Sequence, residues 1–413
     1  MKIIMLAPFA FTPKATVSAR AFPMAQALVK RGHDITIYMP PYDNLGDAGR
    51  VSEQDGVQLY NLNIRRVGAL TPLTAARQMA IWAHRERPDV IHVFKPVGYA
   101  ALAGMMLALT TRIPLVTDSD DWEGTGGWNS VNPYPQHWKR FFDFQERWLP
   151  RHSATVTVAS RTLETQMWGL GIPPDRVRYV PNCPGAAFLK ERQQLDRSQA
   201  AFLRRELGIG NAPMAIYVGH ITLGDDLDIA LGAWKKVQEQ LPTAQLVIVG
   251  SGDGLERLQA RVQTMDLAQA VTFTGWVDHS LVPSYLAAAN AAVYPYRDTL
   301  INRAKCSIKV LEYMAMGKAV VTHRVGQNTE YLEHLHSGYL AEPGSVEDFA
   351  AGLLQVLQDR DLAQRLGDNA AQRIEHKFSW ATRIEDVERA YKDACKADRT
   401  TNHPGTRSRS GSL

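Results

Sequence analysis

Residues 309–321 read KVLEYMAMGKAVV and carry the clearest structural signal in this sequence. Leu311 and Met314 recur at helical spacing, which predicts a buried helix face. Gly317 predicts the end of that helix, and the apolar run after it predicts a buried β-strand. Glu312 lies among these apolar residues, where an unpaired carboxylate is costly to bury. We therefore expect a specific hydrogen-bond partner for Glu312, although a surface glutamate on an amphipathic helix would give the same pattern.

Further short motifs flank this segment in a fixed order: VGH (218–220), QLVIVGSGDG (245–254), VTFTG (271–275) and AAVYP (291–295) before it, and Gly326, Glu330 and GYLAEPG (338–344) after it. Over residues 214–391 this series resembles the C-terminal domain of the family 4 retaining glycosyltransferases, also called glycosyl transferases group 1. Agreement in the N-terminal half is weaker. The resemblance implies the GT-B fold, in which two Rossmann-like α/β domains face each other across a cleft.

Length and composition predict a two-domain globular protein. The chain of 413 residues exceeds the size of one ordinary core. A hydrophobic content of 45% with 21% charged residues is typical of soluble globular chains. A net charge of +4, without a basic run interleaved with aromatics, gives no support to nucleic-acid binding. The 3 cysteines are widely spaced, which favours a reducing compartment over a disulfide framework or a zinc site.

The chain shows no targeting or membrane-spanning pattern. Met1 and Lys2 run directly into an apolar strand pattern, which predicts the absence of a signal peptide. The most apolar stretch, residues 99–109, is shorter than the roughly 18 residues that span a bilayer. We expect a cytoplasmic protein, attached at most to the inner face of the plasma membrane. Residues 398–413 are rich in Ser, Thr, Arg and Gly, and we expect them to be disordered.

The N-terminal half alternates short apolar runs with helical patterns, which predicts a parallel sheet covered on both faces. We expect strands at 3–6, 35–38, 90–94, 115–117 and 155–159, and helices at 18–30, 73–87, 98–109 and 136–149. Ligands of such sheets bind at the carboxyl ends of the strands.

Residues 181–185, Pro-Asn-Cys-Pro-Gly, interrupt this alternation and predict a domain boundary. The expected organisation is an acceptor domain at 1–185, a polar linker at 186–205 and a nucleotide-sugar donor domain at 206–377. The resemblance implies that a helix at about 378–395 packs back on the first domain.

The resemblance assigns Glu312 to the ribose hydroxyls of the donor, as the second Glu of the Glu-x7-Glu motif of the family. The position of the first Glu holds Ala304 in this chain, which puts the recognition of the sugar hydroxyls in question. Asn302 and Arg303 are candidate substitutes. The tight loop whose backbone amides face phosphate and sugar in the family is formed here by Cys306, Ser307 and Ile308.

The diphosphate-binding positions also depart from the family pattern. An Arg and a Lys are common there, and this chain has His220 and Asp225. A protonated His220 could donate to a phosphate oxygen, whereas Asp225 would repel it. Lys309 could reach a phosphate as a point charge, but a solvated lysine at a helix start explains it as well. Arg297 and Arg303 are further candidates.

Gly250 and Gly252 follow a strand and open a helix, but the third glycine of a dinucleotide fingerprint is missing. The resemblance places this turn and Gly219 near the nucleotide, where glycine permits close backbone approach. Trp276 and Val277 match the position that flanks the base, and an ordinary strand-end turn is the alternative.

The run Asp118-Ser119-Asp120-Asp121 follows a strand of the N-terminal half. Carboxylates this close repel one another unless they bind cations or hydroxyls. The DxD spacing looks like the metal motif of the GT-A class, but the longer GT-B series argues against it, and we expect neither metal nor cofactor. In many family members a His stands at the position of Asp120. Asp120 and Asp121 are therefore candidate catalytic residues, able to accept a proton or to stabilise positive charge on the sugar, with a loop-stabilising role as the alternative.

Two more N-terminal segments are candidates. Thr16 and Ser18 lie where the family often has glycines whose amides approach the donor phosphate, and their hydroxyls could do similar work. Ser18 is equally well explained as a helix N-cap. Residues 137–149 are aromatic and basic, which is typical of a segment on an anionic membrane or over a lipid-linked acceptor. A core role for these aromatics is the favoured alternative.

The resemblance implies a metal-independent hexosyltransferase that acts on a nucleotide diphosphate sugar and retains the α configuration. Its acceptor would be a saccharide or a lipid-linked hydroxyl in cell-envelope polysaccharide or glycolipid synthesis. A GT-B nucleotide-sugar epimerase is one rival, but the carboxylate and histidine set that it needs is not found. A degenerate GT-B domain that only binds a nucleotide or a partner is the other, and the departures at Ala304, His220 and Asp225 favour it.

Overall fold

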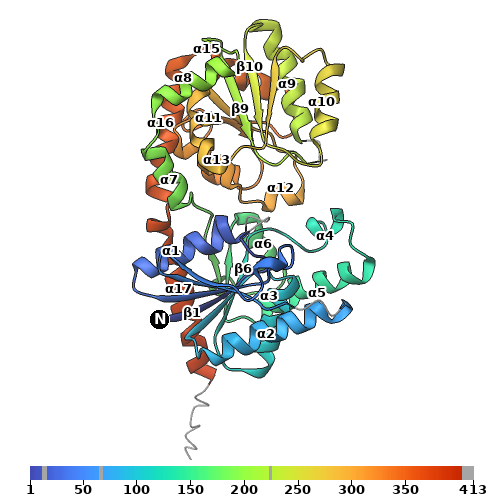
Figure 1. Ribbon diagram of the computed structural model, residues 1–413, viewed down its shortest axis with the longest axis vertical. Coiled ribbons are helices and arrows are strands. Elements are labelled where there is room, and N and C mark those ends of the chain that lie inside the picture. The colour runs from blue at the N-terminus through green and yellow to red at the C-terminus, as the bar shows by residue number, and fades with distance from the viewer. Residues whose placement is uncertain (12–15, 65–67, 223–225, 402–413) are drawn as a thin grey trace, which may run out of the picture. The chain divides into compact units, whose positions relative to one another are not determined.

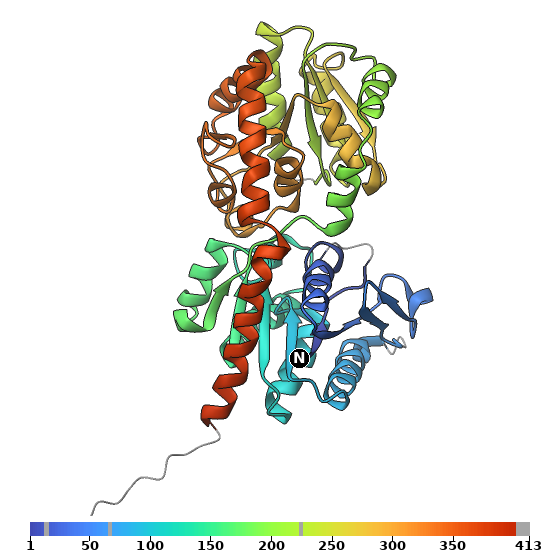
Figure 2. The same ribbon diagram turned by 90° about the vertical axis from the view of Figure 1, so that its left-hand side faces the viewer.

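The computed structural model describes residues 1–11, 16–64, 68–222 and 226–401, except for the side chains of Ala69, Arg197 and residues 398–401. The chain divides into two compact units, Met1–Pro181 together with the chain from Arg383 on, and Asn182–Thr382. Each unit holds one sheet flanked by helices (Figures 1 and 2). The expectation of two α/β domains is confirmed.

The first unit contains an eight-stranded sheet in the order β3-β4-β2-β1-β5-β6-β7-β8, parallel except for the β3–β4 pair. Its strands are β1 (Lys2–Leu6), β2 (Asp34–Met39), β3 (Val51–Gln54), β4 (Val57–Asn61), β5 (Val90–Phe94), β6 (Leu115–Ser119), β7 (Thr155–Val158) and β8 (Val177–Tyr179). Its helices are η1 (Val17–Ala21), α1 (Phe22–Lys30), η2 (Leu45–Asp47), η3 (Gly68–Leu70), α2 (Thr71–Arg85), α3 (Gly98–Thr110), α4 (Trp128–Val131), α5 (Gln136–His152), α6 (Arg161–Gly169) and η4 (Pro174–Arg176), joined by α17 (Trp380–Thr401). The strands expected from the sequence are present, and β3, β4 and β8 are additional.

The central strands β5 and β6 are buried along their whole length, as parallel strands covered on both faces are. Ile91 and Val93 of β5 pack with α2 and α3 in one core cluster. His92 alternates to the other face and bonds there to Tyr391 of α17. The register pairs Phe94 with Asp118, so the residues that follow β5 and β6 emerge at the same edge of the sheet.

The last helix, α17, packs back on the first unit, as expected. Glu388 accepts hydrogen bonds from Arg31 at 2.9 Å and from His33 at 3.0 Å. Arg178 of β8 forms an ion pair with Asp393 at 2.9 Å. The chain end therefore stabilises the sheet of the N-terminal domain. The tail expected to be disordered lies outside the described residues from 402 onward, and α17 extends to Thr401.

The second unit contains a six-stranded sheet, parallel throughout, in the order β11-β10-β9-β12-β13-β14. Its strands are β9 (Met214–Val218), β10 (Gln245–Val249), β11 (Val271–Gly275), β12 (Ala291–Tyr294), β13 (Ala319–His323) and β14 (Tyr339–Ala341). Its helices are α7 (Ala186–Gln193), α8 (Arg197–Glu206), α9 (Asp226–Gln240), α10 (Leu255–Thr264), η5 (His279–Leu281), α11 (Val282–Ala288), α12 (Leu300–Ala304), α13 (Ile308–Ala315), α14 (Asn328–Tyr331), α15 (Val346–Gln358) and α16 (Arg360–Lys377).

The segment 309–321 folds as its pattern predicts. Helix α13 ends before Gly317, whose φ of +65° is a conformation that glycine adopts without strain, and β13 follows. A Cβ on Gly367 of α16 would stand 1.9 Å from the Gly317 carbonyl, so the two backbones touch at this turn.

The prediction of a polar linker at 186–205 is wrong. Helices α7 and α8 occupy it, and α8 packs against α11. Asp196 caps α8 by accepting from the Ser198 amide, and Arg204 donates to the carbonyls of Gly210 and Ala288. The polar residues of this stretch cap and anchor helices. A linker has a similarly polar composition, so the sequence alone did not distinguish the two.

Candidate active site

Glu312 has the specific partners that its apolar surroundings required. Its side chain is 3% exposed. Oε1 lies 3.0 Å from His279 Nε2, and Oε2 accepts from Lys309 Nζ at 2.9 Å. Burial favours the neutral acid, but the Lys309 ammonium and His279 outweigh it and hold the pKa of Glu312 below its ordinary value. Glu312 is therefore an ionised carboxylate at the first turns of α13.

His279 is a residue of this site that sequence reasoning missed. It lies on η5, 33 residues before Glu312, and its side chain is 57% exposed. No periodicity or motif links two residues at such a separation. Lys309, expected to face a phosphate, bonds to Glu312, and its role toward a phosphate stays a prediction.

Tyr313, the next residue of α13, ties the helix to the sheet. Its hydroxyl donates to the Val218 carbonyl at 2.9 Å and accepts from the Val218 amide at 2.7 Å. Both groups belong to the carboxyl end of β9, directly before Gly219. The loop after β9 is thereby held against α13.

Gly250 and Gly252 are required by backbone packing. They have φ of +141° and +156°, and a Cβ on them would stand 1.9 Å from the Gly219 carbonyl and 2.2 Å from the Ile221 carbonyl. Glycine therefore lets the loops after β9 and β10 touch. The approach of this turn to a nucleotide stays a prediction.

The loop before α13 is anchored through Cys306. Its sulfur lies 2.6 Å from the Tyr331 hydroxyl, and its carbonyl accepts from the Asn182 side chain at 2.8 Å. Ser307 occupies the N-cap position without a side-chain capping bond, and Ile308 begins the helix. The first amides of α13 have no acceptor within the helix, so this end can donate to an anion.

The residues considered as substitutes at the altered positions are engaged locally. Asn302 is buried and donates to Asp226 and to the Arg297 carbonyl, both at 3.0 Å. Arg303 forms a two-bond ion pair with Asp298, one bond at 2.7 Å. Ala304 is fully buried, so the position of the first family Glu faces the protein interior.

The other donor-side candidates are more open. The His220 side chain is exposed and lies 3.4 Å from Asp253. Trp276 is exposed and Val277 is half-buried, directly after β11. Asp225 lies outside the described residues. These positions offer surface for a ligand, and their assignments stay predictions.

Asp118 is an internal anchor of the N-terminal domain. Both of its oxygens accept from Arg20 at 2.7 Å, and Oδ2 also accepts from Thr157 at 2.6 Å. Burial raises the pKa of Asp118, but Arg20 outweighs burial and the pKa lies below its ordinary value. Burial lowers the pKa of the neighbouring His92 to about 4, so this imidazole is neutral at pH 7. The DxD pattern thus divides into a buried anchor at Asp118 and a separate group around Asp120.

Asp120 and Asp121 surround the ammonium of Lys95 together with Glu123. Lys95 Nζ donates to Glu123 Oε1 at 2.7 Å and to Asp121 Oδ2 at 3.0 Å, and lies 3.4 Å from Asp120 Oδ1. Lys95 has φ +60°, a strained conformation for a lysine, and its side chain is 7% exposed. Lys95 and Glu123 were not predicted as site residues, although Lys95 directly follows β5 and Glu123 lies two residues after Asp121.

Glu146 completes this group from α5. It is fully buried, and neither carboxyl oxygen has a hydrogen-bond partner among the described residues. Burial, followed by the negative charge of Glu123, raises the pKa of Glu146 well above its ordinary value. Burial likewise raises the pKa of Asp120, to about 7, against the opposing charge of Lys95. We call Asp120, Asp121, Glu123 and Glu146 around Lys95 the acid cluster.

An apolar pocket of about 250 Å³ lies between α2, α3 and α5. Its lining residues are Pro72, Gly98, Tyr99, Leu102, Tyr134, Trp138, Phe141 and Phe142. The aromatic side chains of residues 137–149 thus line a cavity and contact one another: Trp138 stacks on Phe142 with ring centroids 5.8 Å apart.

Near β1, Thr16 stands at the N-cap of η1 without a capping bond, and Ser18 lies within η1, so the N-cap explanation of Ser18 is wrong.

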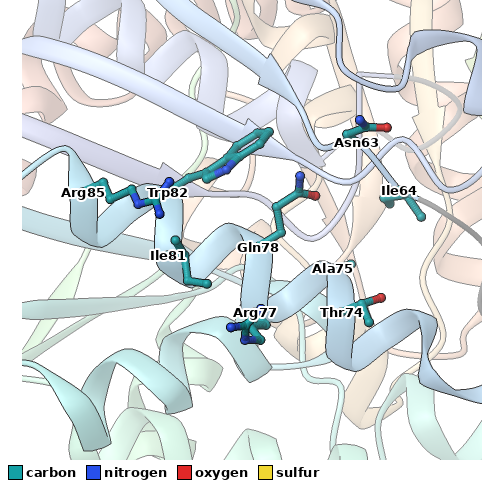
Figure 3. Close-up of a pocket in the computed structure, with 9 residues that line it drawn as sticks. All are labelled: Asn63, Ile64, Thr74, Ala75, Arg77, Gln78, Ile81, Trp82 and Arg85. Atoms are coloured by element: carbon teal, nitrogen blue, oxygen red, sulfur yellow. The ribbon is translucent and has the colours of Figure 1, made fainter.

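A second pocket, of about 440 Å³, lies along α2 (Figure 3). Figure 3 shows Gln78 and Trp82 rising from α2 toward Asn63 and Ile64 after β4. None of the residues predicted to act on donor or acceptor lines it.

No helix among the described residues has the length and apolarity to cross a membrane, and these residues contain no group of three or more His, Cys, Asp or Glu placed to hold a metal ion.

Two family models match this chain. The model described as "Glycosyl transferases group 1" matches residues 199–373, and the "Glycosyl transferase 4-like domain" matches residues 16–183. The two matches coincide with the second unit and with the first, respectively.

Relatives of known name are similar over most of their length. Phosphatidyl-myo-inositol mannosyltransferase of Mycolicibacterium smegmatis is 25% identical over 95% of this chain and 93% of its own. N-acetyl-alpha-D-glucosaminyl L-malate synthase of Bacillus anthracis is 24% identical over 79% of this chain and 80% of its own. Among solved structures, Anabaena Alr3699/HepE in complex with UDP and glucose has a TM-score of 0.73 at 18% identity, covering 94% of this chain and 99% of its own. Sucrose-phosphate synthase from Thermosynechococcus elongatus also has a TM-score of 0.73, at 19% identity, covering 96% of this chain and 100% of its own.

Proposed function

The chain belongs to the group 1 glycosyl transferases and is a two-domain GT-B glycosyltransferase, and on that basis we propose that it is a retaining, metal-independent hexosyltransferase. It moves a hexose from a nucleotide diphosphate sugar to an acceptor hydroxyl. Names of relatives such as the M. smegmatis phosphatidyl-myo-inositol mannosyltransferase support an acceptor from glycolipid or envelope polysaccharide synthesis. The proposed place is the cytoplasm, with peripheral contact to the membrane that carries such acceptors.

The observation that carries this proposal is the ionised Glu312 at the start of α13. A carboxylate with two oxygens suits two vicinal ribose hydroxyls, each of which donates one hydrogen bond. Lys309 and His279 hold Glu312 charged until the donor arrives. When the ribose takes its place on the carboxylate, Lys309 becomes available to a donor phosphate one turn away.

The proposed chemistry needs stabilisation of a leaving diphosphate. The free amides at the start of α13 and the Lys309 ammonium supply it without a metal ion. The bond from the anomeric carbon to the phosphate oxygen breaks as the acceptor oxygen forms its bond on the same face. The acceptor proton passes to the leaving phosphate oxygen. Asp120, the group of the acid cluster with a pKa of about 7, orients the acceptor hydroxyl, and in its ionised form it is the alternative acceptor of this proton in place of the phosphate oxygen.

The test is release of nucleotide diphosphate from a panel of UDP-, GDP- and ADP-sugars, with and without EDTA. We expect release from one donor, unaffected by EDTA and lost in Glu312→Ala. Glu347→Gln is the matched control, because Glu347 is an exposed carboxylate of the same domain. Loss of release with EDTA would contradict metal independence. No release from any donor, with saccharide and lipid acceptors supplied, would favour the degenerate binding domain.

A further inference from the structure

The acid cluster contains more carboxylates than the cations that face it. Among the described residues, Lys95 is the ammonium that contacts Asp120, Asp121 and Glu123, and Glu146 adds a fourth carboxyl group. Arg20, a second cation of this domain, is bound through two bonds to Asp118. The described part of the cluster therefore holds more carboxyl groups than cations in a mostly buried setting, where charge interactions are stronger than in water.

The acid cluster also contains more hydrogen-bond acceptors than donors among the described residues. An ammonium has three N–H donors, and Lys95 uses two of them in hydrogen bonds to Asp121 and Glu123, while Asp120 Oδ1 lies 3.4 Å away. Ionised carboxylates only accept, and the second oxygens of Asp121 and Glu123 have no hydrogen bond to a described residue. Among the described residues, the unbonded acceptor atoms of the cluster therefore outnumber its unbonded donors. A group that only donates, such as a protonated amine, matches these unbonded acceptor oxygens better than a hydroxyl, which both donates and accepts.

Some buried polar atoms of the acid cluster have no hydrogen-bond partner among the described residues. Both oxygens of the fully buried Glu146 and Oδ1 of Asp120 lack a hydrogen bond among the described residues. Burial, followed by the negative charge of Glu123, raises the pKa of Glu146, so its carboxyl lies within electrostatic reach of the cluster. Native proteins rarely leave such groups unsatisfied, so each one calls for an explanation such as an absent ligand.

The cluster is open to solvent on one side and borders an apolar surface on another. The side chains of Asp121 and Glu123 are 27% and 17% exposed, so they are reached before Asp120. Tyr134 lines the aromatic pocket, and burial, followed by the negative charge of Glu123, raises its pKa. Glu146 lies one helical turn after Phe142, another residue of that pocket. A ligand on the cluster can therefore extend an apolar part into the pocket.

We infer that the acid cluster binds an amine-bearing acceptor, whose protonated amine contacts Asp121 and Glu123 and whose aromatic or aliphatic part occupies the pocket between α2, α3 and α5. This inference rests on the proposed function, because it names the acceptor class for the same reaction. The acceptor hydroxyl then lies beside Asp120. A protonated amine also supplies the positive charge that the cluster lacks.

The test compares probes that differ only in the amine. Calorimetric titrations use p-nitrophenyl glucosaminide, glucoside and N-acetylglucosaminide, and the sugar-free pair 4-phenylbutylamine and 4-phenylbutan-1-ol. We expect the free amine of at least one set to bind about tenfold more tightly than its neutral counterparts, equivalent to about 1.4 kcal/mol. No binding of either amine, or affinities within twofold of the neutral probes, would overturn the inference.

Variants that each neutralise one carboxylate test whether the acid cluster causes the amine preference. Asp121→Asn and Glu123→Gln keep the side-chain shape, and each should reduce the amine preference to less than about threefold at an unchanged melting temperature. Asp175→Asn removes an exposed carboxylate of the same domain on η4 and should retain the preference. A preference that persists in both cluster variants would place the amine elsewhere and refute the site.

UDP and GDP binding separates this inference from the proposed function. Nucleotide binding and donor turnover without an amine preference would refute the acceptor class alone. An amine preference without any nucleotide binding would leave the cluster as an amine site and refute the transferase.

Discussion

Replacing Glu312 by glutamine tests the donor site most directly. The substitution keeps the size of the side chain but removes the charge that Lys309 and His279 hold at 2.9 Å and 3.0 Å. If Glu312 accepts from two ribose hydroxyls, the variant loses the charge assistance of both bonds and keeps one acceptor oxygen. A hydrogen bond to a charged group contributes about 1.5–3 kcal/mol. The free protein also loses bonds from Lys309 and His279, so we expect a net loss of roughly 1.5–3 kcal/mol in nucleotide affinity.

That loss corresponds to an increase of about 10- to 150-fold in the Kd of the preferred nucleotide diphosphate. Isothermal titration calorimetry with UDP, GDP and ADP measures it directly, and the melting temperature without ligand reports on folding. Glu347→Gln should leave the Kd unchanged. A Glu312→Gln protein that is folded and binds the nucleotide within twofold of the parent would refute the assignment of Glu312 to the ribose.

Three further predictions concern the acid cluster, the loops after β9 and β10, and the terminal helix. If Asp120 must be ionised to act as a base, kcat/KM rises with pH through about 7, the value to which burial raises its pKa, and Asp120→Asn abolishes this rise in a pH–rate profile. Gly250→Ala places a Cβ 1.9 Å from the Gly219 carbonyl and should lower the free energy of unfolding by more than about 2 kcal/mol in urea, whereas Gly169→Ala, with open space around it, should change it by less than about 1 kcal/mol. The pKa of Glu388 falls from 4.5 in the unfolded chain to about 2, chiefly through its bond from Arg31, so its stabilisation is present above pH 4.5 and is lost as the pH falls toward 2. Glu388→Gln should therefore cost about 1–2 kcal/mol at pH 7, reduced by solvent screening of Arg31, and the difference from the parent should shrink in melts between pH 5 and 2.

Much of the fold follows from local patterns. The apolar runs at 3–6 and 90–94 become β1 and β5 because a strand buried on both faces needs continuous apolar side chains. Edge strand β3 was not foreseen, because all four of its residues are exposed and its sequence, VSEQ, has no apolar alternation. Helix α8 was mistaken for linker because its composition is polar: the sequence RSQAAFLRRE has only Phe202 and Leu203 as large apolar side chains.

The donor-side candidates were predictable to the extent that they share one segment. Glu312, Lys309 and the loop at 306–308 are adjacent in the sequence, and the structure shows Glu312 bonded to Lys309. The need of Glu312 for a partner followed from its apolar neighbours, but the second partner, His279, comes from a different helix. Its contribution arises only when η5 and α13 pack together.

The sequence alone determined the alternation of strands and helices, the glycine turn after α13 and the acidic run after β6, because each depends on neighbours within a few residues. The tertiary structure decided which carboxylates are used and how. Phe94 and Asp118 stand in register, so Lys95 forms ion pairs with Asp120 and Asp121. Asp118 is instead buried in a hydrogen-bonded ion pair with Arg20. These outcomes depend on charge pairing and burial between segments far apart in the chain, which local periodicity does not encode.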